Sequence, residues 1–207
     1  MAEQTEILTR QERKTATRRA LKDAALRCFA ERDWSGTQIA HVTEAAGVAK
    51  GTFYVHFADM DAVVAELLAE LNAGLVEHML PVWQGKRERD LAATLRETAG
   101  VFLDYWKENE VFVRAYAAKA AAGISVEELR SGINPQARDL MMATLEKLAE
   151  ERAVRVAVRR PELIVQGLLA MWLRLGLQFL FNPDVTRKDV VDALVRMTTG
   201  IADAVLG

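Results

Sequence analysis

The sequence has 207 residues, of which 51% are hydrophobic and 27% charged, and its formal net charge is −2 at pH 7. This composition is typical of one or two globular domains, and the slightly acidic total excludes a uniformly basic nucleic-acid-binding protein. The single cysteine, Cys28, excludes an internal disulfide framework and a cysteine-rich metal site, which fits a reducing cytoplasm.

The first predicted element is a helix over residues 13–32 with an apolar inner face, and it lies in a locally basic stretch. Between positions 10 and 27 there are seven basic residues and two acidic ones, a local net charge of +5. A solvated helix face accounts for such an excess, and so does attraction to nucleic acid phosphates. The segment before this helix has no apolar run of signal-peptide length, so we expect a cytoplasmic protein.

Two short helices follow, separated by a glycine. The first is predicted over residues 37–46, with the Thr37 hydroxyl as its N-terminal cap and Gly47 ending it in the left-handed conformation. The second is predicted over residues 50–57, with Phe53 and Phe57 on its inward face. A helix, a turn that contains glycine and a second helix form the helix-turn-helix unit, whose second helix enters the major groove of DNA.

The outward face of this second helix carries groups that suit DNA. Gly51 would let the start of the helix approach phosphates closely, and the hydroxyl and imidazole groups that follow suit phosphate oxygens. Lys50 suits a guanine edge or a phosphate, and Val55 suits a thymine methyl. The alternative is a helical hairpin whose polar residues are only solvated. The predicted DNA-binding residues are Thr37, Gln38, Lys50, Gly51, Thr52, Tyr54, Val55 and His56.

The segment FAERDWSGTQIAHVTEAAGVAKGTFYVHFADMDAVV, residues 29–64, resembles the N-terminal DNA-binding domain of the tetracycline-repressor-like (TetR) family of bacterial transcriptional regulators. The resemblance covers residues 13–71 by motif and the rest by helix number and length. Three positions depart from the family pattern: Met60 replaces a lysine, Ala49 a capping serine and Asp33 a glycine. The matching positions are Phe29, Trp34, Thr37, Ile39, Ala40, Ala45, Ala46, Gly47, Val48, Lys50, Gly51, Thr52, Tyr54, His56 and Phe57.

Beyond this unit the apolar spacing predicts helices alone. A long helix capped by Asp59 carries an apolar residue at every fourth position and is closed by Pro81. A capping box, Ser125 with Glu128, opens a short helical turn. We predict an all-α fold of about nine helices, with an N-terminal helix-turn-helix three-helix unit, 1–58, and a C-terminal helical ligand-binding and dimerisation bundle, 59–207. The later helices are predicted over residues 91–107, 110–122, 135–152, 161–181 and 187–206.

The apolar segment over residues 163–181 is nearly long enough to span a membrane. Gln166, Arg174 and Gln178 interrupt it, and a central arginine costs about 2.5–3.5 kcal/mol on membrane insertion. We therefore expect no membrane contact and a helix that protein buries on most sides. Arg174 is expected to bond across a subunit interface, together with Gln178, or to form a salt bridge within its own chain.

The resemblance implies that the last two helices pair with their copies in a second subunit. Their apolar residues agree with this, because they are more than one small domain can hide. A twofold dimer would present two recognition helices to half-sites of a near-palindromic double-stranded DNA operator, roughly 34–36 Å apart. The predicted dimerisation residues are Leu168, Trp172, Leu175, Phe179, Val190, Leu194, Ile201 and Val205.

The aromatic and methionine residues of the middle helices are most simply core. The resemblance implies instead that they line a pocket for a small, mostly apolar or aromatic effector, which releases a repressor from its operator. The alternative is a DNA-bound regulator or architectural protein that a protein partner controls without a small effector. The predicted ligand-binding residues are His78, Trp83, Phe102, Trp106, Phe112, Tyr116, Met141, Met142 and Trp172.

No enzymatic activity is expected. His41, His56 and His78 are too scattered for a metal pair on one helix, and no serine or cysteine lies in a recognisable nucleophile motif. No glycine-rich phosphate loop is present either. The sequence therefore predicts no catalytic residue, no metal site and no cofactor.

Overall fold

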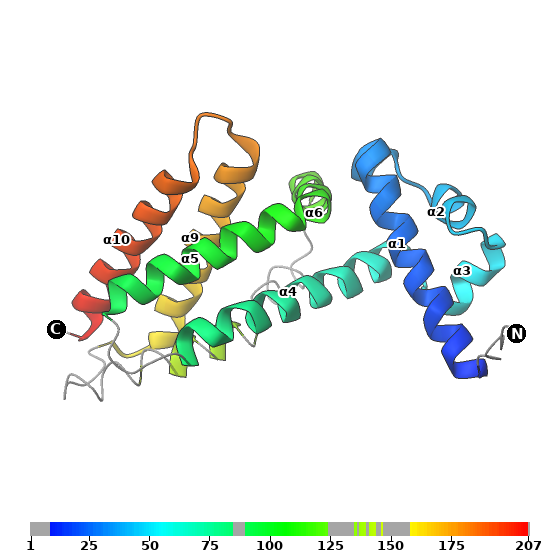
Figure 1. Cartoon of the computed structure of the whole chain (residues 1–207). Helices are drawn as coiled ribbons and strands as arrows, with labels where there is room; N and C mark the ends of the chain where they lie inside the picture. The colour runs from blue at the N-terminus through cyan, green and yellow to red at the C-terminus, as the bar shows by residue number, and fades with distance from the viewer. Residues whose placement is uncertain are drawn as a thin grey trace, which may run out of the picture. The chain divides into compact units, whose positions relative to one another are not determined.

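The computed structural model describes residues 9–84, 90–123 and 158–206, together with residues 135, 137–139, 141–143 and 146. All regular structure in these residues is helical, which confirms the predicted all-α class (Figure 1). The capping box predicted at Ser125 and most of the helix predicted over 135–152 lie outside the described residues. The helices are α1 Arg10–Gly36, α2 Ile39–Ala45, α3 Lys50–His56, α4 Met60–Gln84, α5 Leu91–Glu108, α6 Glu110–Ala122, α9 Pro161–Phe181 and α10 Arg187–Leu206.

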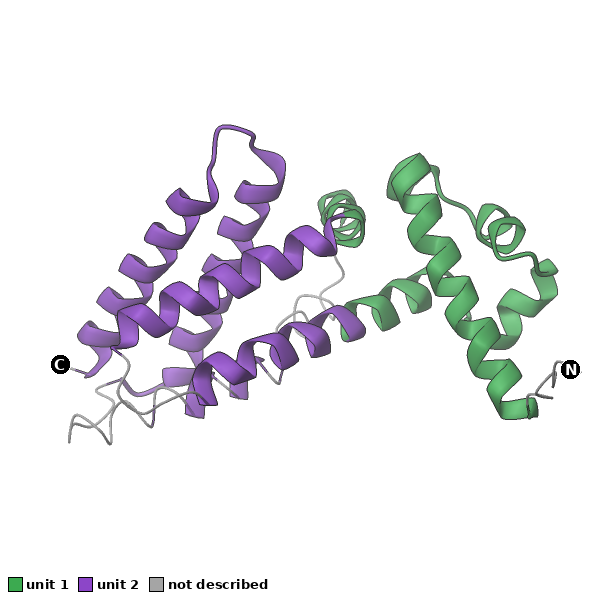
Figure 2. Ribbon diagram, viewed as in Figure 1, with its two compact units in different colours: residues 1–69, 111–123 green, residues 70–110, 124–207 purple. Residues whose placement is uncertain are grey.

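The chain divides into two compact units (Figure 2). The first comprises Met1–Ala69 with Val111–Gly123, and the second comprises Glu70–Glu110 with Ile124–Gly207. Helix α4 therefore contributes residues to both units, and α6 belongs to the first except for its first residue, Glu110. We predicted a DNA-binding unit over residues 1–58 and a ligand-binding and dimerisation bundle over residues 59–207. That division concerns function and stays a prediction.

Helix α1 begins three residues earlier than the apolar spacing predicts, because a capping box stands at its N-terminus. The Glu12 N–H donates to Thr9 Oγ1 at 3.2 Å, and the Thr9 N–H donates back to Glu12 Oε2 at 2.6 Å. Such a box satisfies two backbone donors that the first turn would otherwise leave exposed. Five of the six residues expected on the inner face are buried, namely Leu21, Ala24, Ala25, Cys28 and Phe29, and the sixth, Ala20, is half-buried.

The end of α1 corrects one prediction. Asp33 interrupts the helix with φ 57° and ψ 178°, and Thr37 adopts an extended conformation after it. The Thr37 hydroxyl donates to the Asp33 carbonyl at 2.7 Å, so it caps the end of α1 and not the start of α2. Helix α2 instead begins after Gln38, whose N–H donates to His41 Nδ1 at 3.2 Å.

Asp33→Gly should raise the free energy of unfolding by about 1 kcal/mol, because this φ/ψ region is almost restricted to glycine and strains other residues by about 1–3 kcal/mol. Urea denaturation followed by circular dichroism measures the change. Asp33→Ala is the control, and it should give no gain because alanine keeps the Cβ that causes the strain. An equal gain in both variants would contradict the assignment of strain to this backbone conformation.

Helix α4 confirms one predicted boundary and corrects the other. Asp59 Oδ1 accepts a hydrogen bond from the Ala62 N–H at 2.8 Å, as expected of an N-terminal cap. Pro81 was expected to close the helix, but α4 continues through it to Gln84. A proline in the last turn removes only its own N–H bond, and the residues after it still bond to earlier carbonyls.

In the second unit, α5 packs against both α9 and α10. The rings of Phe102 and Trp106 lie 4.7 Å apart, and the Phe102 and Trp172 rings lie 5.5 Å apart. The Trp172 Nε1–H donates to Thr198 Oγ1 at 3.2 Å. Gly176 on α9 faces this cluster so closely that an added Cβ would lie 2.8 Å from atoms of both Phe102 and Trp106.

The single chain already buries four of the residues predicted to form the dimer interface, and their role in a dimer stays a prediction. Val190, Leu194 and Val205 are buried within the chain, and α10 packs on α5. Trp172 is likewise buried inside its own unit. An apolar stripe on a helix shows that it is covered, but not which helix covers it.

Helix α9 was expected to be buried on most sides by protein, but the single chain alone does not bury it to that extent. Its length and mean hydropathy of 1.6 would suffice for a membrane span, and it is the one such helix in the described part of the chain. Only 22% of its most apolar window is buried. Leu163, Leu173 and Phe181 are exposed along it.

Candidate nucleic-acid interface

The turn between α2 and α3 has the predicted glycine conformation. Gly47 adopts φ 68°, and its N–H donates to the Glu44 carbonyl at 3.0 Å. The next N–H, of Val48, donates to the Thr43 carbonyl at 3.0 Å, which closes the turn. A residue with a Cβ is strained at this φ, so the turn depends on glycine.

Helix α3 is short and depends on one buried ring for its position. Phe53 is fully buried, and Phe57 follows it into the same core, with the two ring centroids 5.8 Å apart. Ala49 precedes the helix and offers no side-chain cap, as the departure from the family pattern implies. Because a seven-residue helix is not stable by itself, packing of Phe53 holds α3 in place.

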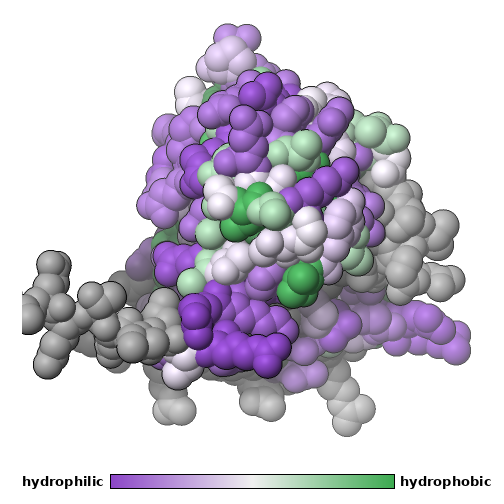
Figure 3. All heavy atoms as spheres, turned by 90° about the vertical axis from the view of Figure 1, so that its right-hand side faces the viewer, coloured by the Kyte–Doolittle hydropathy of each residue, from purple (hydrophilic) through white to green (hydrophobic). Residues whose placement is uncertain are grey.

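The opposite face of α3 is open to solvent. Tyr54 is 53% exposed and Val55 69% exposed, and Lys50 and Gly51 are also exposed. An exposed valine of this degree has no packing role, so its side chain is free to meet a partner. The face of the molecule that carries α2 and α3 is mainly hydrophilic, with small separate hydrophobic patches (Figure 3).

The remaining predicted DNA-binding residues are less exposed, with the exception of Gln38. Thr37, Thr52 and His56 are half-buried. His56 Nδ1 is buried without a hydrogen-bond partner among the described residues. Burial lowers the pKa of His56, and the positive charges of Arg18 and Lys14 lower it further. His56 is therefore neutral at pH 7, and a contact with phosphate would use its Nε2 edge without an added charge.

Part of the basic excess between residues 10 and 27 is used inside the unit. Lys22 Nζ lies 2.9 Å from Glu66 Oε1, and its side chain is only 11% exposed. Arg18 also pairs with Glu66, and Arg27 donates to the Ala45 carbonyl at 3.0 Å. This pairing could not be predicted from the sequence, because Glu66 lies 48 residues after Arg18 in the chain.

Besides Arg27, which is exposed although it donates to Ala45, four basic residues of this stretch are on the surface: Arg10, Arg13, Lys14 and Arg19. The Arg19 Nε and Asp23 Oδ2 lie 3.9 Å apart, and an exposed pair of that length contributes little. Exposed cations in the same unit as an exposed helix face suit phosphate contacts on either side of a groove. The interface thus combines these cations with the open face of α3.

The predicted ligand-binding residues fall into separate groups. Phe102, Trp106 and Trp172 form the packed aromatic cluster of the second unit, whereas Phe112 and Tyr116 lie on α6, with ring centroids 6.2 Å apart, in the first. The side chains of Trp83, Met141 and Met142 are half-buried, and His78 is exposed. The His78 ring lies 4.8 Å from the ring of Tyr105.

A hollow of about 700 Å³ opens on the surface formed by α5 and α10. It contains none of the predicted ligand-binding residues. Five of its nine lining residues are charged, and two of them pair, with Arg187 Nε 2.9 Å from Asp104 Oδ1 and an η nitrogen 2.8 Å from Oδ2. Within the part of the chain that the structure describes, no cluster of three or more histidine, cysteine or acidic side chains is placed to hold a metal.

Sequence comparison matches the region that forms this interface. Residues 21–67 match the family described as bacterial regulatory proteins, tetR family. The HTH-type transcriptional regulator AcrR of Shigella flexneri is 36% identical over 83 residues, which are 39% of this chain and 37% of that protein. The chain spans well under half the length of the curated relatives it matches.

Two solved structures share the fold along nearly the whole chain. A tetR-family transcriptional regulator from Streptomyces coelicolor has a TM-score of 0.69 at 19% identity, over 92% of this chain and 83% of that one. The fatty acid degradation regulator FadR from Bacillus halodurans has a TM-score of 0.65 at 19% identity, over 92% of this chain and 95% of that one. At such identities the likeness concerns the fold alone.

Proposed function

Because this chain belongs to the TetR family of bacterial transcriptional regulators, we propose that it binds a near-palindromic DNA operator as a homodimer and represses transcription until a small effector releases it. The observation that supports this most is α3, a short helix with a fully buried Phe53 on one face and an exposed Lys50, Tyr54 and Val55 on the other. Such a protein is a DNA-binding regulator of the cytoplasm and not an enzyme.

The exposed faces of α9 and α10 support the dimer. Leu173 on α9 is 43% exposed and Met197 on α10 is 47% exposed. Nothing lies within 4 Å of a Cβ added at Gly200, so another helix has room to approach there. Apolar surface of this kind is typical of subunit interfaces. The predicted interface residues that remain partly accessible for it are Leu168, Leu175, Phe179 and Ile201.

The proposed release mechanism uses α4, which contributes residues to both units. An effector in the second unit that favours one tilt of α4 would change the separation of the two recognition helices. Allosteric couplings of this type are typically about 1–3 kcal/mol. Because FadR of Bacillus halodurans is a fatty acid degradation regulator, long-chain acyl compounds belong in an effector screen beside aromatic ones.

A protein partner in place of a small effector is the second candidate. The packed cluster of Phe102, Trp106 and Trp172 favours it, because these rings fill their space with one another. A thermal-shift screen separates the two candidates. Selective stabilisation by a small molecule that also weakens operator binding supports the ligand-released repressor, whereas a stabilising ligand that leaves operator affinity unchanged contradicts it.

The base and phosphate contacts of α3 are tested by three substitutions. Tyr54→Phe should weaken binding to operator and non-operator duplexes equally, because its hydroxyl is assigned to phosphate. Lys50→Ala and Val55→Ala should change sequence preference, each by about 1–3 kcal/mol at the base pair it contacts. Fluorescence anisotropy with single-base variants of the operator measures both effects. Equal affinity of all three variants and the wild type would contradict this contact assignment.

The proposed function itself is tested by finding the operator. Selection of duplexes from a random library, and footprinting of the DNA that flanks the protein's own gene, should identify one near-palindromic site. Affinity for it should fall by several decades between about 50 and 200 mM salt, because bound lysine and arginine release counterions. Failure to enrich any duplex at low salt would contradict the proposal.

A further inference from the structure

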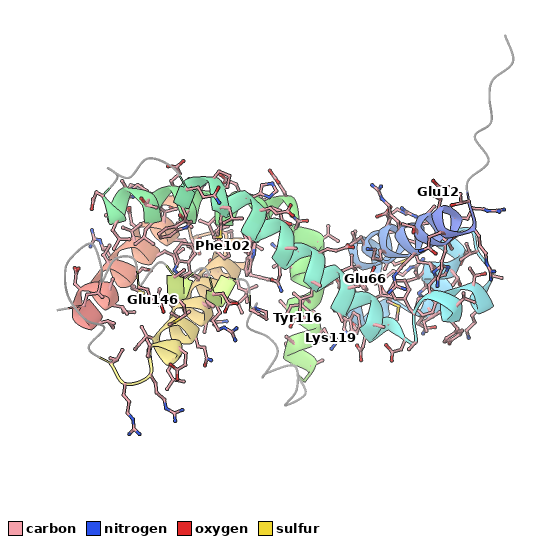
Figure 4. All side chains as sticks on the ribbon, turned by 90° about the horizontal axis from the view of Figure 1, so that it is seen from below. Glu12, Glu66, Phe102, Tyr116, Lys119 and Glu146 are labelled. Carbon is pink, nitrogen blue, oxygen red and sulfur yellow. The ribbon has the colours of Figure 1, made fainter. Side chains whose placement is uncertain are left out.

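Side chains from α1 and α4 meet at Glu66 in the first unit, and Figure 4 labels Glu66 on α4. Arg18 donates to the Glu66 carboxylate through Nε, at 2.8 Å from Oε2, and also through an η nitrogen. Lys22, one turn further along α1, lies 2.9 Å from the other carboxylate oxygen. Glu66 thus holds two cations on the same face of α1.

Arg18 also reaches the end of α3. Its second η nitrogen donates to the backbone carbonyl of His56, the last residue of α3. Its guanidinium carbon lies 4.1 Å from the centroid of the Phe57 ring, a cation–π contact. The last carbonyls of a helix lack partners within the helix and carry its negative dipole end, so a guanidinium stabilises them.

The cluster depends on the negative charge of Glu66. The hydrogen bond from Arg18 lowers the pKa of Glu66 against the effect of burial, and Lys22 lowers it further, so the carboxylate is ionised at neutral pH. Without that charge, Lys22 and Arg18 would both lose the carboxylate that holds them together. Breaking a partly buried charge cluster by removing one member is destabilising for this reason.

We propose that Arg18 is a positioning residue for the recognition helix: held by Glu66, it fixes the C-terminal end of α3 and makes no contact with DNA phosphate. This inference rests on the proposed function of α3 in DNA binding. It assigns to α4 a direct effect on α3 through two side chains, in addition to any movement of whole helices. It also removes one of the seven basic residues of the sequence stretch 10–27 from the set of phosphate contacts.

Positioning and simple electrostatics predict opposite effects for Glu66→Gln. The substitution removes a negative charge from the DNA-binding unit, which by charge alone should tighten binding to every duplex. If Glu66 acts through Arg18 and α3, binding to the operator should instead weaken. The sign of the change therefore separates the two explanations, whatever its size.

The experiment uses the full chain and two probes, the duplex that the wild type enriches most from a random library and a shuffled duplex of equal composition. Glu66→Gln and Arg18→Lys should each lower the ratio of operator to shuffled affinity about ten-fold, as expected when a hydrogen bond to a charged group is lost. Arg18→Lys keeps the charge but lacks the planar fork, so charge cannot explain its effect. The double variant should be no worse than either single one, because both act through one cluster.

Arg32→Lys is the matched control, since Arg32 is exposed on the same helix but lies outside the basic stretch 10–27, and it should leave the affinity ratio within two-fold. Circular dichroism shows whether each variant is folded, and titration of binding-competent protein corrects each affinity for any unfolded fraction. If Glu66→Gln is unfolded, Arg18→Lys alone tests the proposal. Tighter operator binding by Glu66→Gln, or an Arg18→Lys effect equal to that of Arg32→Lys, would overturn the positioning role. Wild-type protein that enriches no duplex would contradict the proposed function itself.

Discussion

Phe53→Ala should lower the free energy of unfolding of the first unit by about 3–5 kcal/mol, the range observed when a buried phenylalanine is truncated to alanine. The ring is fully buried and contacts the rings of Tyr54, 5.6 Å away, and Phe57. Helix α3 has seven residues and no side-chain cap, so nothing local replaces the lost packing. Urea denaturation followed by circular dichroism measures the loss, and operator binding should disappear with it.

Val55→Ala on the same helix is the control for this result. Val55 is two residues from Phe53 but points to solvent, so its truncation should change stability by less than about 0.5 kcal/mol. The pair separates the anchoring face of α3 from its contact face. A loss below about 1 kcal/mol for Phe53→Ala would mean that α3 is held by other contacts, since typical core truncations cost more.

Leu173→Glu should convert the dimer to a monomer and lower operator affinity by about 10²–10⁴-fold, the gain that joining two binding sites usually gives. Leu173 is exposed in the single chain and lies on the apolar face of α9. Burying a carboxylate there without a partner would cost more than a subunit interface can tolerate. Sedimentation measures the mass, and fluorescence anisotropy measures the affinity for full and half operators.

Val111→Glu provides the matched control for the dimer. Val111 on α6 is 42% exposed, close to the 43% of Leu173, and the substitution adds the same charge. It should leave the protein dimeric with unchanged half-operator affinity. If Leu173→Glu remains a dimer at micromolar concentration, the exposed faces of α9 and α10 are not the subunit interface.

The helices with regular apolar spacing and clear end signals could be predicted from the sequence. Helix α6 and helix α10 have the predicted bounds, and α5 ends one residue later. Gly47 could also be predicted, because only glycine readily adopts the conformation that its position requires. These features depend on residues close together in the chain, which a single sequence displays directly.

Features that depend on distant partners could not be predicted. In the sequence, Arg18 is one of several basic residues that could contact phosphate. The structure shows that it bonds to Glu66, which lies on another helix. The apolar stripe of α10 suggests a subunit interface. In the structure α10 packs on α5, and Val190 and Leu194 are already buried in the single chain. Even Thr37 was misplaced, because its hydroxyl has two helix ends within reach and the kink at Asp33 decides between them.

The close approach of Phe102 and Trp106 to Gly176 limits which substitutions this sequence can accept. With ring atoms of both residues 2.8 Å from the place of an added Cβ, a side chain at 176 fits only if a ring becomes smaller. Positions 102, 106 and 176 should therefore covary among relatives: glycine where both large rings persist, and alanine or serine only where one ring has been replaced.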